Sequence, residues 1–421
     1  MLRLSEIKKR GVATFTAAIL LGGMLVSGAS SAAQAASDAP TRQSARTGGT
    51  ALAASEDGYD RYTLEECRQK DESSAGQQWY YLNHFSSCGI QHNFVYNFKD
   101  AVTKKVTAWY TFRITVLGEG YRDQKKMHYE VYTDQWARHE TDQGTVNSNA
   151  LISWTLTCAS VKCSATGGVD SSRISAWILD PNKKVSVDFD TTGAPPDRND
   201  PDHYLQDRVS HHQLEVNLFG EDDDAPRAMS QRFRCDEPYN GYGDTMKPGC
   251  LYDQVPSRMH YSYNTYPSLA LHIYTAQKHP EMTYPTSDFP DLHLVIPGDE
   301  HADPANLKPL RRLYPGMDAK AQSYYDNNRS QVSTACATLP PQPQEQCDEY
   351  PFASTWEGAY FHTLHNDPSD PDFKWNYSVR YIPGPENQAG GTALAQWYVQ
   401  DHILAGDPFW VQIDDIPEEL K

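Results

Sequence analysis

Beyond residue 35 the chain lacks an apolar run of the roughly 18–20 residues that a transmembrane helix needs, so no membrane-spanning segment is expected there. It also lacks an excess of basic side chains, because 55 acidic residues outnumber 37 basic ones and give a formal net charge of −18. Residues 325–421 alone carry 15 acidic and four basic side chains. Tight, sequence-specific binding of nucleic acid is therefore not expected. Weak, salt-sensitive binding helped by a divalent cation remains compatible with this charge.

Zinc and calcium motifs are missing as well. No Cys-x2-Cys sequence occurs, and Cys158 and Cys163 have no second cysteine pair nearby to complete a zinc site. The acidic run at residues 221–224 lacks the spaced oxygen ligands and the glycine of a calcium-binding loop. We interpret this run as a solvated turn. We also find no internal repeat.

The eight cysteines fall into close pairs along the chain, which predicts structural disulfides in an exported protein. Many connectivities are formally open, and pairing between neighbours is the simplest of them. The expected disulfides are Cys67–Cys88, Cys158–Cys163, Cys235–Cys250 and Cys336–Cys347.

The N-terminus has the pattern of a secretory signal peptide. Basic residues at 8–10 precede a largely apolar stretch at 12–26, and a small-x-small sequence follows at 33–35. We expect residues 1–35 to be removed on export and residues 36–58 to be a flexible leader. The alternative, an uncleaved membrane anchor, is disfavoured because the apolar stretch is short for a span. The mature protein is thus expected to be secreted, with no membrane partner.

Residues 59–290 predict a β-rich domain. Apolar and polar residues alternate over several short runs rich in β-formers, with turn residues between them. We expect an antiparallel sandwich or barrel. The expected strands include residues 109–116, 128–133, 151–157, 173–179, 185–190, 213–219 and 268–274. The aromatic residues of this region fit either an ordinary core or a face that binds a surface polymer such as a carbohydrate.

A proline-rich connector at residues 291–324 is expected to lead into a C-terminal domain at 325–421 that folds alone from about residue 320. A helix is expected at 318–325 and another at 392–402, where Thr392 is the expected N-cap after two glycines. The expected strands are residues 347–352, 377–382 and 409–413.

Two motifs in this region carry the chemistry. Residues 347–358 read CDEYPFASTWEG, and residues 383–391 read PGPENQAGG. Together they resemble the NucA/NucB family of secreted bacterial deoxyribonucleases, over about residues 325–413. The resemblance implies a small ββα-metal-like nuclease domain, hence an α+β protein overall. It also implies a secreted, metal-dependent hydrolase that cleaves DNA without strong sequence specificity, with RNA left open.

The resemblance also suggests roles for single residues. Asp348 is the expected general base, and Glu349 and Glu357 are further catalytic candidates. Glu357 and Asn387 are the expected metal ligands for Mg²⁺ or Mn²⁺, and which of Glu349, Glu357 and Glu386 binds the metal stays open. Because neighbours in a strand point to opposite faces, only one of Asp348 and Glu349 is expected to enter the site directly.

Other assignments remain open. His362 and His365 have spacing that can bind a metal on a helix, but we interpret them as exposed histidines of an inserted loop. The paired carboxylates are also compatible with a glycoside hydrolase. A non-enzymatic binding or adhesion protein with an inactive nuclease-like domain is the other alternative.

Overall fold

A computed structural model describes residues 59–421 except 71–75, 161, 193–207, 221–226, 239–245, 287–294, 341 and 368. The expected signal peptide, the leader and the acidic run at 221–224 lie outside the described residues. Ala51–Lys421 form one compact unit. Among the described helices, none combines the length and the apolar character that crossing a membrane requires.

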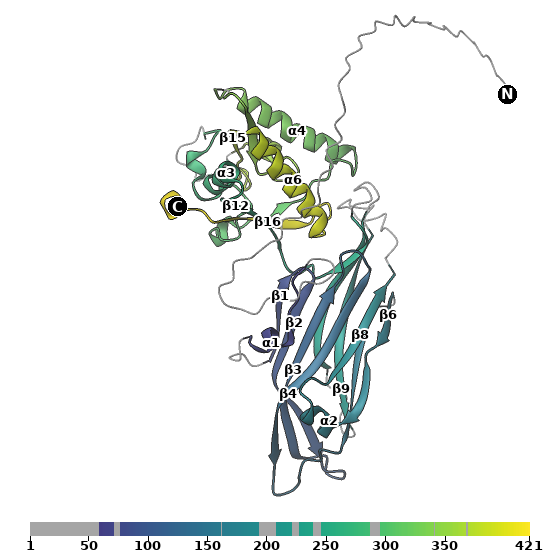
Figure 1. The fold of residues 1–421 in the computed structure, drawn as a ribbon. Coiled ribbons are helices and arrows are strands. Elements are labelled where there is room, and N and C mark those ends of the chain that lie inside the picture. The colour runs from purple at the N-terminus through teal and green to yellow at the C-terminus, as the bar shows by residue number, and fades with distance from the viewer. Residues whose placement is uncertain are drawn as a thin grey trace, which may run out of the picture. The chain divides into compact units, whose positions relative to one another are not determined.

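The β-rich region forms two antiparallel sheets (Figure 1). The first sheet has the order β1 (Gly76–Asn83), β2 (Ser86–Lys99), β3 (Val106–Gly120), β4 (Lys126–Glu140), β8 (Lys184–Thr191) and β6 (Cys163–Gly167). The second has the order β11 (Gly249–Leu251), β10 (Arg227–Glu237), β9 (Arg208–Gly220), β5 (Leu151–Cys158) and β7 (Val169–Arg173). Two short helices accompany them, α1 (Leu64–Arg68) and α2 (Ile174–Leu179).

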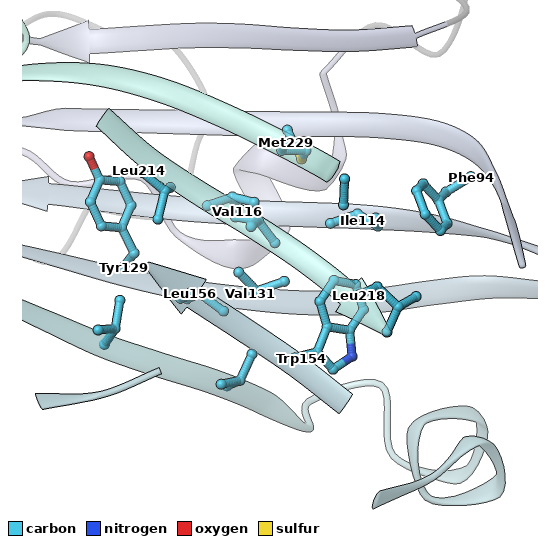
Figure 2. Close-up of a cluster of buried hydrophobic side chains, with 14 of the residues drawn as sticks. Phe94, Ile114, Val116, Tyr129, Val131, Trp154, Leu156, Leu214, Leu218 and Met229 are labelled. Atoms are coloured by element: carbon cyan, nitrogen blue, oxygen red, sulfur yellow. The ribbon is translucent and has the colours of Figure 1, made fainter. Parts of the chain in front are cut away.

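One apolar core joins these two sheets. In β8 every second residue is buried, as the alternating sequence predicted. Figure 2 shows Val131 of the first sheet and Trp154, Leu156 and Leu214 of the second among the side chains that fill the space between them. Two separate antiparallel sheets around a shared core make a sandwich, which confirms the antiparallel β-rich prediction and decides between the sandwich and the barrel.

One expected strand of this region is wrong. Residues 173–179 were expected to be extended, but β7 ends at Arg173 and α2 follows. Ile174 and Trp177 are three residues apart and both are fully buried, which fits one face of a helical turn.

The remaining described residues form a mixed α/β arrangement. Its helices are α3 (Pro267–Lys278), α4 (Ala319–Cys336), α5 (Ala359–Leu364), α6 (Gly384–Gln400) and the 3₁₀ turns Pro280–Met282, Pro304–Asn306 and Glu418–Leu420. Its strands are β12 (Ser257–Ser262), β13 (Leu310–Arg311), β14 (Glu345–Tyr350), β15 (Ser378–Pro383) and β16 (Pro408–Asp414). β14 and β15 pair antiparallel, and α6 follows β15 directly.

The core of this arrangement includes residues on both sides of the expected boundary at 290. β12 pairs in parallel with β16, so residues near 260 lie beside residues near 411. Met259 and Leu269 belong to the same buried cluster as Trp397 and Phe409. The segment 257–278 therefore packs with the C-terminal elements rather than with the sandwich core.

The expected strand at 268–274 is wrong, because these residues lie in helix α3. Leu269, Ile273 and Ala276 are buried at positions i, i+4 and i+7, which line one face of a helix. Pro267 is in the first turn, where its missing N–H costs no hydrogen bond.

Helix α6 begins earlier than expected, at Gly384 rather than near Thr392. The two glycines at 390 and 391 are therefore helical rather than part of a turn. A Cβ on Gly390 would lie 2.2 Å from Leu269 Cδ2, whereas a Cβ on Gly391 would have no neighbour within 4 Å. Gly390 thus lets α6 approach α3 closely.

All four expected disulfides are present: Cys67–Cys88, Cys158–Cys163, Cys235–Cys250 and Cys336–Cys347. The last one joins the end of α4 to β14, the strand that carries Asp348.

Candidate active site

A cavity of about 370 Å³ lies where β14, the turn after it and α6 meet. Its lining includes Asp348 and Glu349 from β14 and Asn387 from the first turn of α6. Arg312, next to β13, supplies a positive charge to the same wall. Three of the residues that the sequence singled out thus line one cavity.

Asp348 and Glu349 both line this cavity, although alternation along a strand predicted that only one of them would. Glu349 is the last residue but one of β14, and the turn residues Ala353 and Ser354 also line the cavity. The cavity therefore extends around the end of β14, so that both carboxyl groups border it.

Asp348 is held by a histidine. The Nδ1 atom of His272 in α3 lies 2.6 Å from Asp348 Oδ2, and its Nε2 atom lies 2.8 Å from Ser378 Oγ in β15. All three side chains are buried. A carboxylate only accepts hydrogen bonds, so Nδ1–H is the donor. The orientation of Asp348 is thus fixed through one oxygen.

Glu349 has an unusual ionisation. Burial, and then the negative charge of Asp348, raise the pKa of Glu349 to about 8. A weak hydrogen bond from the Ala353 N–H, 3.4 Å from Oε1, opposes this shift. At neutral pH one of the two neighbouring carboxyl groups is therefore mostly protonated.

Asn387 and Glu386 lie next to each other in the first turn of α6 but have different contacts. Asn387 Nδ2 donates to the Cys347 carbonyl at 3.4 Å, which leaves its amide oxygen as the atom suited to a cation. Glu386 Oε1 accepts from the Leu269 N–H at 2.8 Å, in the first turn of α3. Glu386 thus caps α3 instead of lining the cavity.

Glu357 does not line the cavity. Its side chain is buried, and its two oxygens accept from the Arg311 N–H at 2.7 Å and from Arg311 Nε at 2.8 Å. Burial raises the pKa of Glu357, and the charge of Arg311 opposes the shift. Binding a cation with this carboxylate would require breaking the pair with Arg311.

The loop that carries Glu357 is ordered by a buried asparagine. Asn328 Nδ2 in α4 donates to the Ala353 and Thr355 carbonyls at 2.9 and 3.0 Å, and its Oδ1 accepts from the Tyr360 N–H at 2.9 Å. One side chain thus fixes both ends of the turn that follows β14.

His362 and His365 lie elsewhere, and the interpretation as exposed loop histidines is wrong, because His362 is in α5 and both side chains are half-buried. His362 Nδ1–H donates to the Trp375 carbonyl at 3.1 Å, and His365 Nδ1 pairs with Asp370 at 2.9 Å. His365, Asp370 and Asp372 form one of two groups within the described ranges whose ligand atoms are close enough for a metal. The other contains Cys158 and Cys163, whose sulfurs form a disulfide, so it offers no thiolate ligands.

Sequence reasoning missed His272 and Arg312. His272 is 76 positions away from Asp348 and lies in a segment that was assigned to a strand of the β-rich domain. No local pattern marks such a contact. Arg312 lies beside Leu310 and Arg311, just before the region that resembles the nuclease family, and this position is only weak evidence for a role in the site.

Comparison with known families agrees with this location. Residues 311–412 match the family described as deoxyribonuclease NucA/NucB. A search of the curated proteins and a search of the solved structures each found no match. The resemblance indicated by the two motifs is confirmed, and it assigns the C-terminal region to a nuclease family. His272 and the strand β12 lie outside the matched residues.

Proposed function

Because residues 311–412 match the NucA/NucB deoxyribonucleases, we propose that the protein is a secreted, metal-dependent endonuclease that hydrolyses phosphodiester bonds of DNA without strong sequence specificity. The observation that carries the proposal is the cavity that Asp348, Glu349 and Asn387 share inside the matched region. We further propose that the pair of strands β14 and β15 followed by α6 is a ββα-metal-like finger.

Asp348 is the proposed general base. Its Oδ2 is engaged by His272, which leaves Oδ1 as the oxygen proposed to meet a water in the cavity that the side chain lines. A water placed there gives up one proton to Asp348 while its oxygen attacks the phosphorus, the phosphorus–oxygen bond to one sugar breaks, and the departing sugar oxygen takes a proton from solvent. The Ser378 and His272 contacts hold the carboxylate so that no rotation is needed before the proton moves.

The donors in the cavity fit a hard divalent cation, because carboxylate and amide oxygens are the ligands that Mg²⁺ and Mn²⁺ prefer. Glu349, on giving up its proton, and the Asn387 amide oxygen would hold the ion, and the ion would stabilise negative charge on the phosphate oxygens. Glu357 stays a predicted ligand that would first have to leave Arg311.

Arg312 supports a role on an anionic substrate. Its guanidinium lines the cavity, donates to the Ile403 carbonyl and lies 4.6 Å from the centre of the Tyr398 ring. These contacts fix a positive charge near the position proposed for the phosphate, in a protein whose net charge is −18. Substrate binding is therefore expected to weaken steeply as salt concentration rises.

The test is digestion of covalently closed plasmid DNA by the purified protein. We expect nicked and linear products with Mg²⁺ or Mn²⁺ and none with EDTA, because a closed circle has no ends for an exonuclease. Asp348→Asn should lower the rate about 100-fold or more, since an amide cannot accept the proton.

The alternatives give different results in the same assay. Folded protein that binds but never cleaves DNA would favour the binding or adhesion protein. Release of reducing sugar from a polysaccharide, without any cleavage of DNA, would favour the glycoside hydrolase. Equal cleavage by wild type and Asp348→Asn would refute the role of Asp348 and leave the nuclease assignment standing.

A further inference from the structure

His272 is a buried histidine for which neither motif accounts. It is 1% exposed, and both of its ring nitrogens are within hydrogen-bond distance of polar side chains, Asp348 and Ser378. It comes from α3, which lies before the residues that match the nuclease family. A buried polar ring in this position is costly unless its hydrogen bonds are made, and here both are made.

The hydrogen bonds define how His272 acts on Asp348. The carboxylate can only accept, so the His272 Nδ1 atom keeps its proton in this contact. The Ser378 hydroxyl can donate to Nε2 or accept from it, so it fits either form of the ring. In each form Nδ1–H points at Oδ2 and occupies one of the two oxygens of Asp348.

Helix α3 is docked on the same elements that build the cavity. Its first turn is capped by Glu386 of α6 through the Leu269 N–H at 2.8 Å, and Gly390 of α6 leaves room for Leu269. Tyr261 in β12 donates to the Gly390 carbonyl at 2.9 Å. His272 is therefore carried by a helix whose position relative to Asp348 is fixed by several independent contacts.

We propose that His272 is a positioning residue of the nuclease site, which holds the Asp348 carboxylate in the orientation required of the general base. The inference rests on the proposed function. It extends the functional unit beyond the matched region, to the segment from β12 through α3.

The physical role follows from the burial of the pair. A buried carboxylate oxygen is costly unless a donor satisfies it. The hydrogen bond of 2.6 Å from Nδ1–H satisfies Oδ2 of Asp348 and fixes its direction. The other oxygen is left to accept the proton from water.

The experiment compares three substitutions of His272 in the full-length protein. His272→Asn places an amide N–H close to the position of Nδ1 and keeps a donor to Asp348. His272→Gln places its amide near Nε2, so it keeps the contact with Ser378 and loses the one with Asp348. His272→Leu loses both. His362→Gln is the matched control, because that histidine binds a backbone carbonyl and does not line the cavity.

We expect His272→Gln and His272→Leu to lower kcat for plasmid cleavage about 10- to 100-fold with little change in KM, as losses of supporting hydrogen bonds commonly do. His272→Asn should keep most of kcat, and His362→Gln all of it. Thermal unfolding of each variant separates this effect from a general loss of structure.

Two results would overturn the inference. One is a wild-type kcat in folded His272→Gln and His272→Leu. The other is a loss of kcat in all three His272 variants that is proportional to the loss in melting temperature. A purely structural role of His272 predicts this second result. Wild-type protein that cleaves no DNA would instead refute the proposed function, and this inference with it. An active wild type with an equally active His272→Leu would refute the inference alone.

Discussion

Two buried aspartate–histidine pairs can be compared in this molecule. Asp348 lies 2.6 Å from His272 Nδ1, and Asp236 in β10 lies 3.1 Å from His402 Nδ1, just after α6. The first aspartate lines a cavity, and the second does not. The second also lies 3.2 Å from Arg234, which forms two bonds of 2.9 Å with Asp407.

The difference lies in what the second carboxylate oxygen contacts. In Asp236 one oxygen lies 3.1 Å from His402 Nδ1 and the other 3.2 Å from Arg234, but both oxygens are buried without a hydrogen bond of normal geometry, and the side chain does not line the cavity. In Asp348 only Oδ2 is engaged by histidine, and the side chain borders open space. The pair of Asp236 and His402 is thus part of the buried interior, whereas the pair of Asp348 and His272 borders a cavity in which chemistry is possible.

The ionisation of His402 fits this contrast. Burial lowers the pKa of His402, but the charge of Asp236 and the carbonyl of Lys247 outweigh burial and raise it overall. His402 Nε2–H donates to that carbonyl at 2.7 Å. With both ring nitrogens facing acceptors, the charged ring is favoured more than in an ordinary histidine. It contributes stability at low pH that is lost as the pH rises through the raised pKa.

The largest expected effect on folding and cleavage comes from fragments that keep only the pair of Asp348 and His272, or neither of the two aspartate–histidine pairs. Residues 256–421 keep Asp348 and His272 without Asp236 and should retain cleavage of DNA. Residues 320–421 should not fold, which reverses the expectation from the sequence alone. They lack β12 and the buried residues Tyr261, Leu269 and Ile273, each contributing about 1.5–3 kcal/mol, against a typical total of about 5–15 kcal/mol. Circular dichroism and plasmid nicking measure both properties, and an active fragment 320–421 would contradict the shared core.

Asp236→Asn, set against Asp348→Asn, should separate stability from activity. Removing the Asp236 charge leaves His402 without its nearby carboxylate, whereas Arg234 keeps its two bonds with Asp407, so a cost of about 1–3 kcal/mol in the free energy of unfolding is expected. Its rate of cleavage below the melting temperature should stay near wild type. Asp348→Asn should show the opposite pattern. Urea denaturation and cleavage rates of the two variants give the answer, and two variants that behave alike would remove the distinction between the pairs.

Glu349→Gln should change the pH dependence of stability. The folded protein keeps the Glu349 proton up to about pH 8, whereas the ordinary carboxyl pKa of 4.5 applies in the unfolded chain. The free energy of unfolding is therefore expected to fall as pH rises from about 4.5 to 8, because only the unfolded chain ionises in that window. Glu349→Gln should flatten this fall. Urea titrations at several pH values measure it, with Glu345→Gln in the same strand as the control.

The smallest expected effect concerns the two adjacent glycines of α6. Gly390→Ala should lower the free energy of unfolding by about 1–3 kcal/mol, because its Cβ would collide with Leu269 of α3. Gly391→Ala should raise it by about 0.5–1 kcal/mol, because the added Cβ meets nothing and alanine favours a helix. If Gly390→Ala also lowers kcat, then the packing of α3 against α6 affects the position of Asp348 through His272. Equal effects at both positions would argue against close helix packing.

The sandwich could be predicted from the sequence because its strands and disulfides are marked by patterns among residues that are close together in the chain. Alternation of apolar and polar residues identified the segments that became β3, β5 and β8, and neighbouring cysteines identified every disulfide. The motif with Asp348 and Glu349 could also be singled out, through its resemblance to a nuclease family, although only one of the two was expected to enter the site.

The rest of the site could not be predicted, because it depends on contacts between distant segments. The helical character of α3 is hidden in a short mixed run, SLALHIY, whose apolar residues fit a strand as well as a helix. Gly390 was expected to precede the helix at 392–402, although it lies within α6 and allows the close approach to Leu269. Glu357 lies in the motif, yet its partner Arg311 lies 46 positions away.

The disulfide Cys336–Cys347 ends directly before Asp348 and fastens β14 to the end of α4. Such bonds persist in oxidising surroundings and are reduced by the thiols of the cytosol. In a reducing solution the strand that carries Asp348 loses a covalent tether to α4, so its alignment with His272 depends on non-covalent contacts alone. The assembly of this cavity is thereby linked to the redox state of the compartment that holds the chain.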